Sequence, residues 1–140
     1  MTIPAMANAI LILKQSLAIG AAGFFGALSR VLIGTAVERL VGVKPFPLGT
    51  LIVNVSGCFI LGAFYAFAPG GGERPPLSET TRLAIGVGFV GAYTTFSTLM
   101  YDTNRLWTVG EIGKAAANVV LSLILGIIAV RLGIAFGRRP

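Results

Sequence analysis

The sequence predicts an all-α membrane protein with four transmembrane helices. The 140 residues are 55% apolar and 11% charged, and their mean hydropathy is +0.87, whereas an average soluble domain is about 25% charged. Four apolar stretches follow one another along the chain, each long enough to cross about 30 Å of hydrocarbon as a helix. A chain this short cannot hide so much apolar surface in one soluble core.

Charged residues, prolines and glycines separate the four stretches, which together form a single membrane domain over residues 1–140. The expected spans cover residues 16–37, 48–68, 83–100 and 115–136. The gaps at 38–47, 69–82 and 101–114 are expected to be surface loops. Residues 3–13 are expected to form an apolar or interfacial lead-in. The missing basic n-region and Lys14 within the apolar run argue against a cleaved signal peptide.

The charge distribution bears on partners and on topology. The chain has 11 Lys and Arg against 5 Asp and Glu, but no basic run or interleaved aromatic stripe that would indicate nucleic acid. Six Lys and Arg fall on the side that holds both termini, four on the other, and Arg30 lies inside the first span. This asymmetry is too weak to fix an orientation. A single orientation with a poor signal and a chain that inserts both ways and pairs antiparallel with itself both fit.

Small residues within the spans favour self-association. Glycines such as Gly23, Gly26, Gly57 and Gly88 allow helices to approach closely in lipid. Four short helices are also too few to enclose an aqueous path comfortably, whereas eight from two chains could do so. An obligate dimer is therefore expected.

Polar residues inside the spans mark the candidate site, because each must be satisfied within the protein or face water. The third span carries Thr94, Thr95, Ser97 and Thr98 directly after the glycine-rich GVGFVGAY. One hydroxyl by itself usually bonds its own backbone carbonyl one turn back, but four in five positions indicate a segment packed inside the assembly. We expect a helix break here, which would expose backbone carbonyls and amides as in ion transporters. The other intramembrane polar groups are Arg30, Thr50, Asn54, Ser56, Asn118 and Ser122.

Missing residue types exclude several functions. The chain has no His and only Cys58, so disulfides, His or Cys metal clusters and Cys/His catalysis are excluded, and Cys58 is interpreted as a packing residue. All five acids are expected in loops or at helix ends. That leaves no intramembrane carboxylate for proton coupling or acid/base catalysis and favours passive permeation. Without such a counter-charge Arg30 favours an anion, with snorkelling to the headgroups as its alternative.

Three motifs then carry a family resemblance: GAAGFFGALSR in the first span, GTLIVNVSGCFILG in the second and GFVGAYTTFSTLMYD in the third. Over essentially its whole length the chain resembles the Fluc (CrcB) family of fluoride channels. The resemblance implies an antiparallel, dual-topology homodimer in the bacterial plasma (inner) membrane, with the third helix broken at TTFST. It also implies a fluoride-specific channel, not an enzyme, that exports cytoplasmic fluoride by passive electrodiffusion and so lowers its toxicity.

The resemblance also implies roles for individual residues. Carbonyls of Gly91 and Thr94 from both subunits would hold a structural, untransported Na⁺. In the pore, Asn54 would donate to fluoride and the ring edge of Phe96 would face it. Further pore lining would come from Thr50, Ser97, Thr98, Asn118 and Ser122, and Arg30 would lie near the mouth as a vestibule residue. Three positions depart from the family pattern: Leu99 replaces a second Phe, Asn118 replaces Tyr, and Asp102 stands where Glu is usual.

Two other functions are alternatives to the fluoride channel. A small multidrug-type antiporter also has four spans and dual topology, but it would need a membrane-embedded Glu in the first span, where this chain has Arg30. A membrane assembly subunit without transport of its own would use the same hydroxyls for packing alone. The expected partners are fluoride, a second copy of the chain and the lipid bilayer, with no nucleic acid.

Overall fold

The computed structural model describes residues 3–42, 46–69 and 75–138, which form helices and their connecting segments without a strand. The elements are α1 (Ile3–Val41), α2 (Leu48–Phe67), α3 (Glu79–Leu83), the π-helix η1 (Ala84–Val90), α4 (Gly91–Tyr93), α5 (Phe96–Thr108) and α6 (Ile112–Gly137). Four helical segments are long and apolar enough to cross a membrane: α1, α2, α6 and the combined stretch Glu79–Thr108. The prediction of four apolar helices is thus confirmed.

The helices extend further than the expected spans. α1 takes in the lead-in at residues 3–13 without interruption and ends at Val41, where Gly42 adopts a φ of 77°. α5 continues to Thr108, and Gly110 follows with a φ of 82°. Placing a loop over residues 101–114 was therefore wrong, because only 109–111 connect α5 to α6. Charge marked these loops in the sequence, whereas glycines in the left-handed region terminate the helices.

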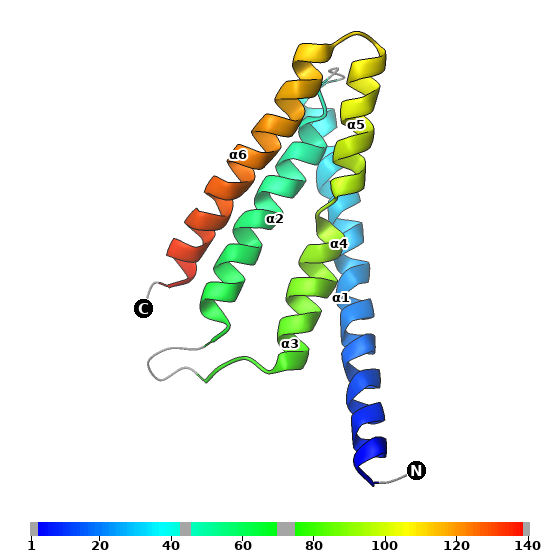
Figure 1. The fold of residues 1–140 in the computed structure, drawn as a ribbon, viewed down its shortest axis with the longest axis vertical. Coiled ribbons are helices and arrows are strands. Elements are labelled where there is room, and N and C mark those ends of the chain that lie inside the picture. The colour runs from blue at the N-terminus through cyan, green and yellow to red at the C-terminus, as the bar shows by residue number, and fades with distance from the viewer. Residues whose placement is uncertain (1–2, 43–45, 70–74, 139–140) are drawn as a thin grey trace.

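The helices pack where glycines let backbones meet (Figure 1). α2 and α6 form the most extensive pair, lying side by side along most of their length. A Cβ added to Gly62 or Gly133 would clash with a backbone carbonyl of the facing helix. Cys58 lies at the same contact, since a Cβ on Gly126 would be 3.4 Å from its Sγ. This agrees with its interpretation as a packing residue.

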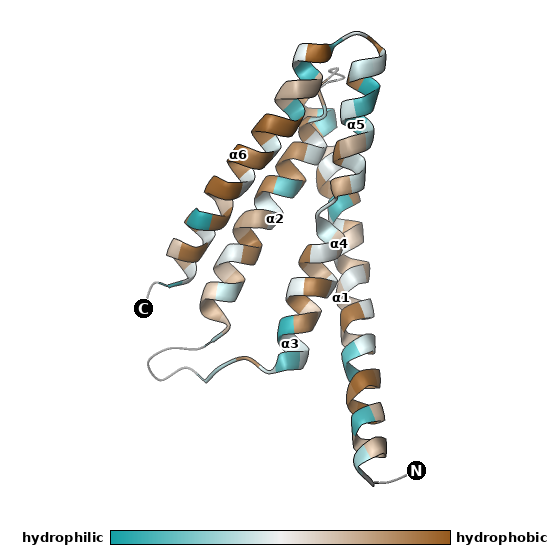
Figure 2. Cartoon of the chain, viewed as in Figure 1, coloured by the Kyte–Doolittle hydropathy of each residue, from teal (hydrophilic) through white to brown (hydrophobic). Residues whose placement is uncertain are grey.

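α1 packs against η1, α4 and α2 and projects past α3 at its N-terminal end (Figure 1). Gly26 is its only buried described residue, and large apolar side chains such as Leu17, Phe24 and Val31 are exposed along it. Figure 2 shows hydrophilic residues on α3 and α5, at intervals along α1 and within α2, and mostly hydrophobic residues over the rest of α2 and α6. The apolar exterior is what a lipid solvent requires.

The third apolar segment positions the site. After α4 ends at Tyr93, Thr94 and Thr95 have extended backbone angles, with φ and ψ of −83° and 159° and of −151° and 117°. α5 then begins at Phe96. The two extended residues lie beside α2 (Figure 1), and Asn54 of α2 hydrogen-bonds the second of them, Thr95.

Candidate functional site

Thr95 begins α5 as its N-cap. Its hydroxyl oxygen accepts a hydrogen bond from the backbone N–H of Thr98 at 3.2 Å, the usual role of Thr at a helix start. The same oxygen lies 3.0 Å from the Thr98 hydroxyl and 3.2 Å from that of Ser97. Thr94 instead donates its hydroxyl to the Val90 carbonyl at 3.0 Å. The threonine run thus divides into one back-bonded hydroxyl and a cluster of three.

Asn54 holds the extended backbone of Thr95 through both ends of its amide. Asn54 Nδ2 donates to the Thr95 carbonyl at 3.0 Å, and the Thr95 N–H donates to Asn54 Oδ1 at 2.7 Å. The side chain therefore pairs with Thr95 as a neighbouring strand would. Because Thr95 is only 8% exposed, these bonds satisfy a donor and an acceptor that would otherwise be buried alone. One of the two Nδ2 protons is left for another acceptor.

Two cavities meet at Thr95. The first, here called the Phe96 cavity, has a volume of about 260 Å³ and is lined by Asn54, Gly57, Cys58, Leu61, Val90, Thr94, Thr95, Phe96, Leu99, Ser122 and Leu123. The second, the Arg30 cavity, has about 350 Å³ and is lined by Arg30, Val31, Gly34, Thr35, Glu38, Gly49, Thr50, Val53, Thr95 and Thr98. Thr95, whose backbone Asn54 holds, lines both cavities and lies at the boundary between them.

The expected pore and vestibule residues divide between these cavities. Asn54, Phe96 and Ser122 line the first, whereas Arg30, Thr50 and Thr98 line the second. Ser97 is exposed and lines neither. Thr50 and Asn54, four residues apart on α2, thus reach different cavities, although their spacing predicts a shared helix face.

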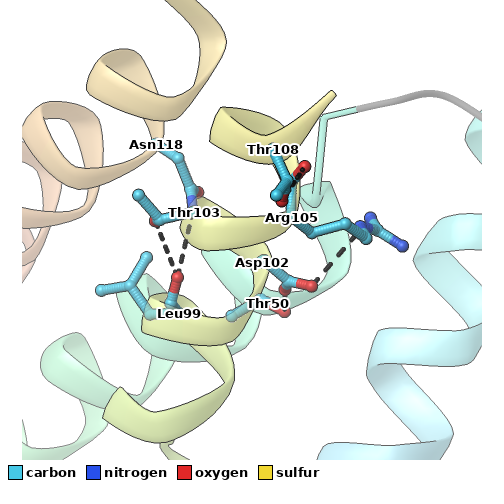
Figure 3. A network of polar contacts seen from close by, with 7 residues as sticks. All are labelled: Thr50, Leu99, Asp102, Thr103, Arg105, Thr108 and Asn118. Carbon is cyan, nitrogen blue, oxygen red and sulfur yellow. Dashed lines mark hydrogen bonds and ion pairs between the residues drawn. The ribbon is translucent and has the colours of Figure 1, made fainter. Parts of the chain in front are cut away.

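Asp102 corrects the expectation that every acid lies in a loop or at a helix end. It is the seventh of the thirteen residues of α5 and only 9% exposed. Its carboxylate accepts a hydrogen bond from the Thr50 hydroxyl at 2.8 Å and lies 4.0 Å from the Arg105 guanidinium (Figure 3). The error followed from ending the third span at Met100. A buried carboxylate is therefore present. The argument that coupled transport lacks such a group no longer holds.

Asn118 is fully buried and connects α6 to α5. Its Nδ2 donates to Thr103 Oγ1 at 2.9 Å and reaches the Leu99 carbonyl at 3.5 Å (Figure 3). Thr103 gives its own proton to Leu99, at 2.8 Å, so the Asn118 amide must face Thr103 with its nitrogen. Among the described residues its Oδ1 and the Ser122 hydroxyl are buried without a hydrogen-bond partner. The amide oxygen of Asn118 thus remains free to accept a hydrogen bond, whereas its amide protons are already donated.

Two backbone carbonyls near the extended residues Thr94 and Thr95 lose the donors that a continuous helix would give them. In a continuous helix the N–H groups of Thr95 and Thr98 would bond the carbonyls of Gly91 and Thr94. They donate instead to Asn54 Oδ1 and Thr95 Oγ1, at 2.7 Å and 3.2 Å. No group of three His, Cys, Asp or Glu residues in the described segments could hold a metal ion. Carbonyl oxygens are of the ligand type that hard cations prefer.

Sequence reasoning included Thr95 among the polar groups of the site but missed its role, and it missed two further contributors. Thr95 supplies the cap and lines both cavities, although its place in the Thr-rich run and the N-cap preference for Thr could have indicated this role. Thr103 links Asn118 to α5, and Tyr93 hydrogen-bonds Ser56 at 2.8 Å. The last two pairings join residues 15 and 37 positions apart, and no local pattern in the sequence signals them.

Four apolar helical segments with amides and hydroxyls gathered at an interruption of the third define a small multi-pass membrane protein with an internal polar site. The chain belongs to the CrcB family. Residues 17–134 match the family described as CrcB-like protein, Camphor Resistance (CrcB).

Relatives from several bacteria support the same assignment. A protein of Acidobacterium capsulatum is 43% identical over 117 residues, which cover 84% of this chain and 90% of the relative. One from Idiomarina loihiensis is 44% identical over 108 residues, covering 77% and 80%. Another from Shewanella amazonensis is 44% identical over 121 residues, covering 86% and 94%. Each of the three is named "Fluoride-specific ion channel FluC".

Proposed function

We propose that this chain is a fluoride-specific ion channel that exports cytoplasmic fluoride by passive electrodiffusion and so lowers fluoride toxicity. Family membership and the names of the relatives support the assignment. The observation in the structure that carries it is the pair Asn54–Thr95 between two cavities. Around that pair lie neutral donors, which are the groups that a path for a strongly hydrated anion requires.

The chemistry of these donors suits fluoride. The ion must exchange its hydration shell for donors at close range in a narrow path. Asn54 retains one amide proton, the hydroxyl of Thr98 can turn toward an ion, and a ring edge such as that of Phe96 carries partial positive charge. Arg30 adds a full positive charge in its cavity. The membrane potential then drives the anion outward without a coupled proton.

We further propose that residues 1–140 act as one membrane domain that forms an antiparallel, dual-topology homodimer in the bacterial inner membrane. Phe96, at the start of α5, is 73% exposed in the single chain. The adjacent Ser97 is exposed as well, and polar residues facing lipid are costly. A second copy would cover this surface and complete the path. The third span then functions as one broken helix, and the weak charge asymmetry permits both orientations.

A structural Na⁺ fits the same arrangement. Gly91 and Thr94 are the residues whose helical donors bond elsewhere, so their carbonyl oxygens are free to bind a cation. Two carbonyls from each subunit would give four oxygen ligands, a donor set suited to a hard ion. When bound, Na⁺ would add positive charge near the helix break. Exchanging Na⁺ for N-methylglucamine should lower the temperature at which the detergent-solubilised dimer dissociates, and an unchanged temperature would argue against the site.

Efflux from liposomes tests the proposed function. Vesicles loaded with fluoride or chloride, with and without the purified protein, are made permeable to K⁺ by an ionophore, and anion release is followed with ion-selective electrodes. We expect rapid fluoride release and chloride release no faster than in protein-free vesicles. Equal, negligible release of both anions would refute the channel and favour an assembly subunit. Fluoride release that required a proton gradient would favour coupled transport.

A further inference from the structure

Glu38 lies at the boundary between the Arg30 cavity and a third, smaller cavity. It lines the Arg30 cavity and also a cavity of about 170 Å³ that is bounded by Arg105 and the residues where α1 ends and α2 begins. Arg30 lies eight residues earlier on α1, a rise of about 12 Å along the helix. An ion that moves from this end of the molecule toward Arg30 therefore passes the Glu38 carboxylate.

The first turn of α2 fixes the position of this carboxylate. A Cβ added to Gly49 would lie 3.2 Å from Glu38 Oε1 and 3.3 Å from its Cγ. The N-cap of α2, Pro47, makes no side-chain hydrogen bond, and the first turn contains no acid. The positive end of the helix dipole therefore attracts the carboxylate. Glu38 thus lies against α2, beside the cavities.

The charge of Glu38 is not paired within the described part of the chain. The ion pairs there join Arg105 to Asp102 and Lys114 to Glu111. Arg30 shares the larger cavity with Glu38 but forms no ion pair with it. A fixed negative charge consequently lies at one mouth of a path whose other lining is neutral or positive. Its sign is opposite to the one that would gather anions.

We propose that the Glu38 carboxylate restricts the supply of anions to the Arg30 cavity. This inference rests on the proposed function. One unit charge about 10 Å away in water lowers the local concentration of a monovalent anion about twofold, and the effect is larger at a lower effective dielectric constant. Neutralising Glu38 should therefore raise fluoride flux at low ionic strength. The effect should fade as salt shortens the screening length.

Efflux from liposomes at two ionic strengths tests this role. Wild-type protein is compared with Glu38→Gln in about 10 mM and about 1 M inert salt, where the Debye length is about 30 Å and about 3 Å. We expect Glu38→Gln to raise initial fluoride flux about twofold or more in low salt and to match wild type in high salt. Glu79→Gln is the matched control: it removes the same charge at the start of α3, and Glu79 lines neither cavity.

Each outcome decides the question. Equal flux of Glu38→Gln and wild type in low salt, or an equal gain in Glu79→Gln, would overturn the inference. Reduced flux together with a lower dissociation temperature would overturn it too and assign Glu38 to capping α2. Glu38→Lys should raise low-salt flux further, because it reverses the charge. Inactive wild-type vesicles would instead refute the proposed function.

Discussion

Replacing Asn54 by Leu should destabilise the protein as well as block conduction. The side chains are similar in size, but Leu can make neither bond to the Thr95 backbone, at 3.0 Å and 2.7 Å. Each backbone group left alone in a buried site costs about 1–3 kcal/mol. Two such groups give about 2–6 kcal/mol, and we expect about 2–3 kcal/mol because water in the adjoining cavities can reach part of this backbone.

The measurement combines unfolding with transport. Unfolding in mixed micelles of increasing SDS fraction, followed by circular dichroism, gives the loss of stability, and fluoride efflux gives the loss of conduction. Ser56→Ala is the control on the same helix, since it removes a single hydroxyl partner of Tyr93 at 2.8 Å and should cost about 1 kcal/mol.

The two readouts separate the roles of Asn54. A variant that conducts nothing yet unfolds at the wild-type SDS fraction would refute the structural argument and leave Asn54 as an ion donor alone. Full conduction would remove Asn54 from the pore. Loss of both stability and conduction is the result that the geometry predicts.

Three further predictions follow from named contacts. Gly26→Ala would drive a Cβ into the Phe89 carbonyl and should lower the free energy of unfolding by about 1–3 kcal/mol. Gly20→Ala is the control and should be neutral, because nothing lies within 4 Å of the added Cβ. Equal unfolding of the two variants would contradict the close approach of α1 to η1. Thr50→Val and Asp102→Leu should be coupled by about 1.5–3 kcal/mol in a double-mutant cycle, because the bond at 2.8 Å involves a charged acceptor and each change removes it. Additive losses would show that the bond contributes nothing. Asn118→Leu and Thr103→Val should have non-additive effects on the free energy of unfolding, because Asn118 donates to Thr103 at 2.9 Å. Both variants should leave the fluoride concentration for half-maximal flux unchanged. A shift in that concentration would make Asn118 an ion ligand.

Asp102 and Asn118 show that contacts between residues far apart in the sequence decide how a polar side chain is used. A charge such as that of Asp102 is expected to end a span, which predicts a position outside the membrane interior. The Thr50 hydroxyl, 52 residues away in the sequence, instead donates a hydrogen bond to the Asp102 carboxylate and stabilises it inside the protein. Asn118, which the resemblance places in the pore lining, gives its amide protons to Thr103 and Leu99. In both cases the side chain's partner decides its chemistry, and the sequence does not name that partner.

The sequence by itself determined that the helices are surrounded by lipid, how many apolar helices there are, and which segment carries the polar groups. These follow from composition and from the length needed to cross hydrocarbon, which are local properties of the chain. It also contained the Thr-rich run beside glycines, where the backbone of Thr94 and Thr95 is extended.

Tertiary structure decided how those polar groups are shared. The pairing of Asn54 with Thr95 spans 41 residues, and it separates Thr50 and Asn54 into different cavities. It also diverts the N–H of Thr95 from the Gly91 carbonyl, its acceptor in a continuous helix, to the Asn54 side chain. Each buried donor must find one acceptor, and only the packed chain determines which acceptor lies within reach.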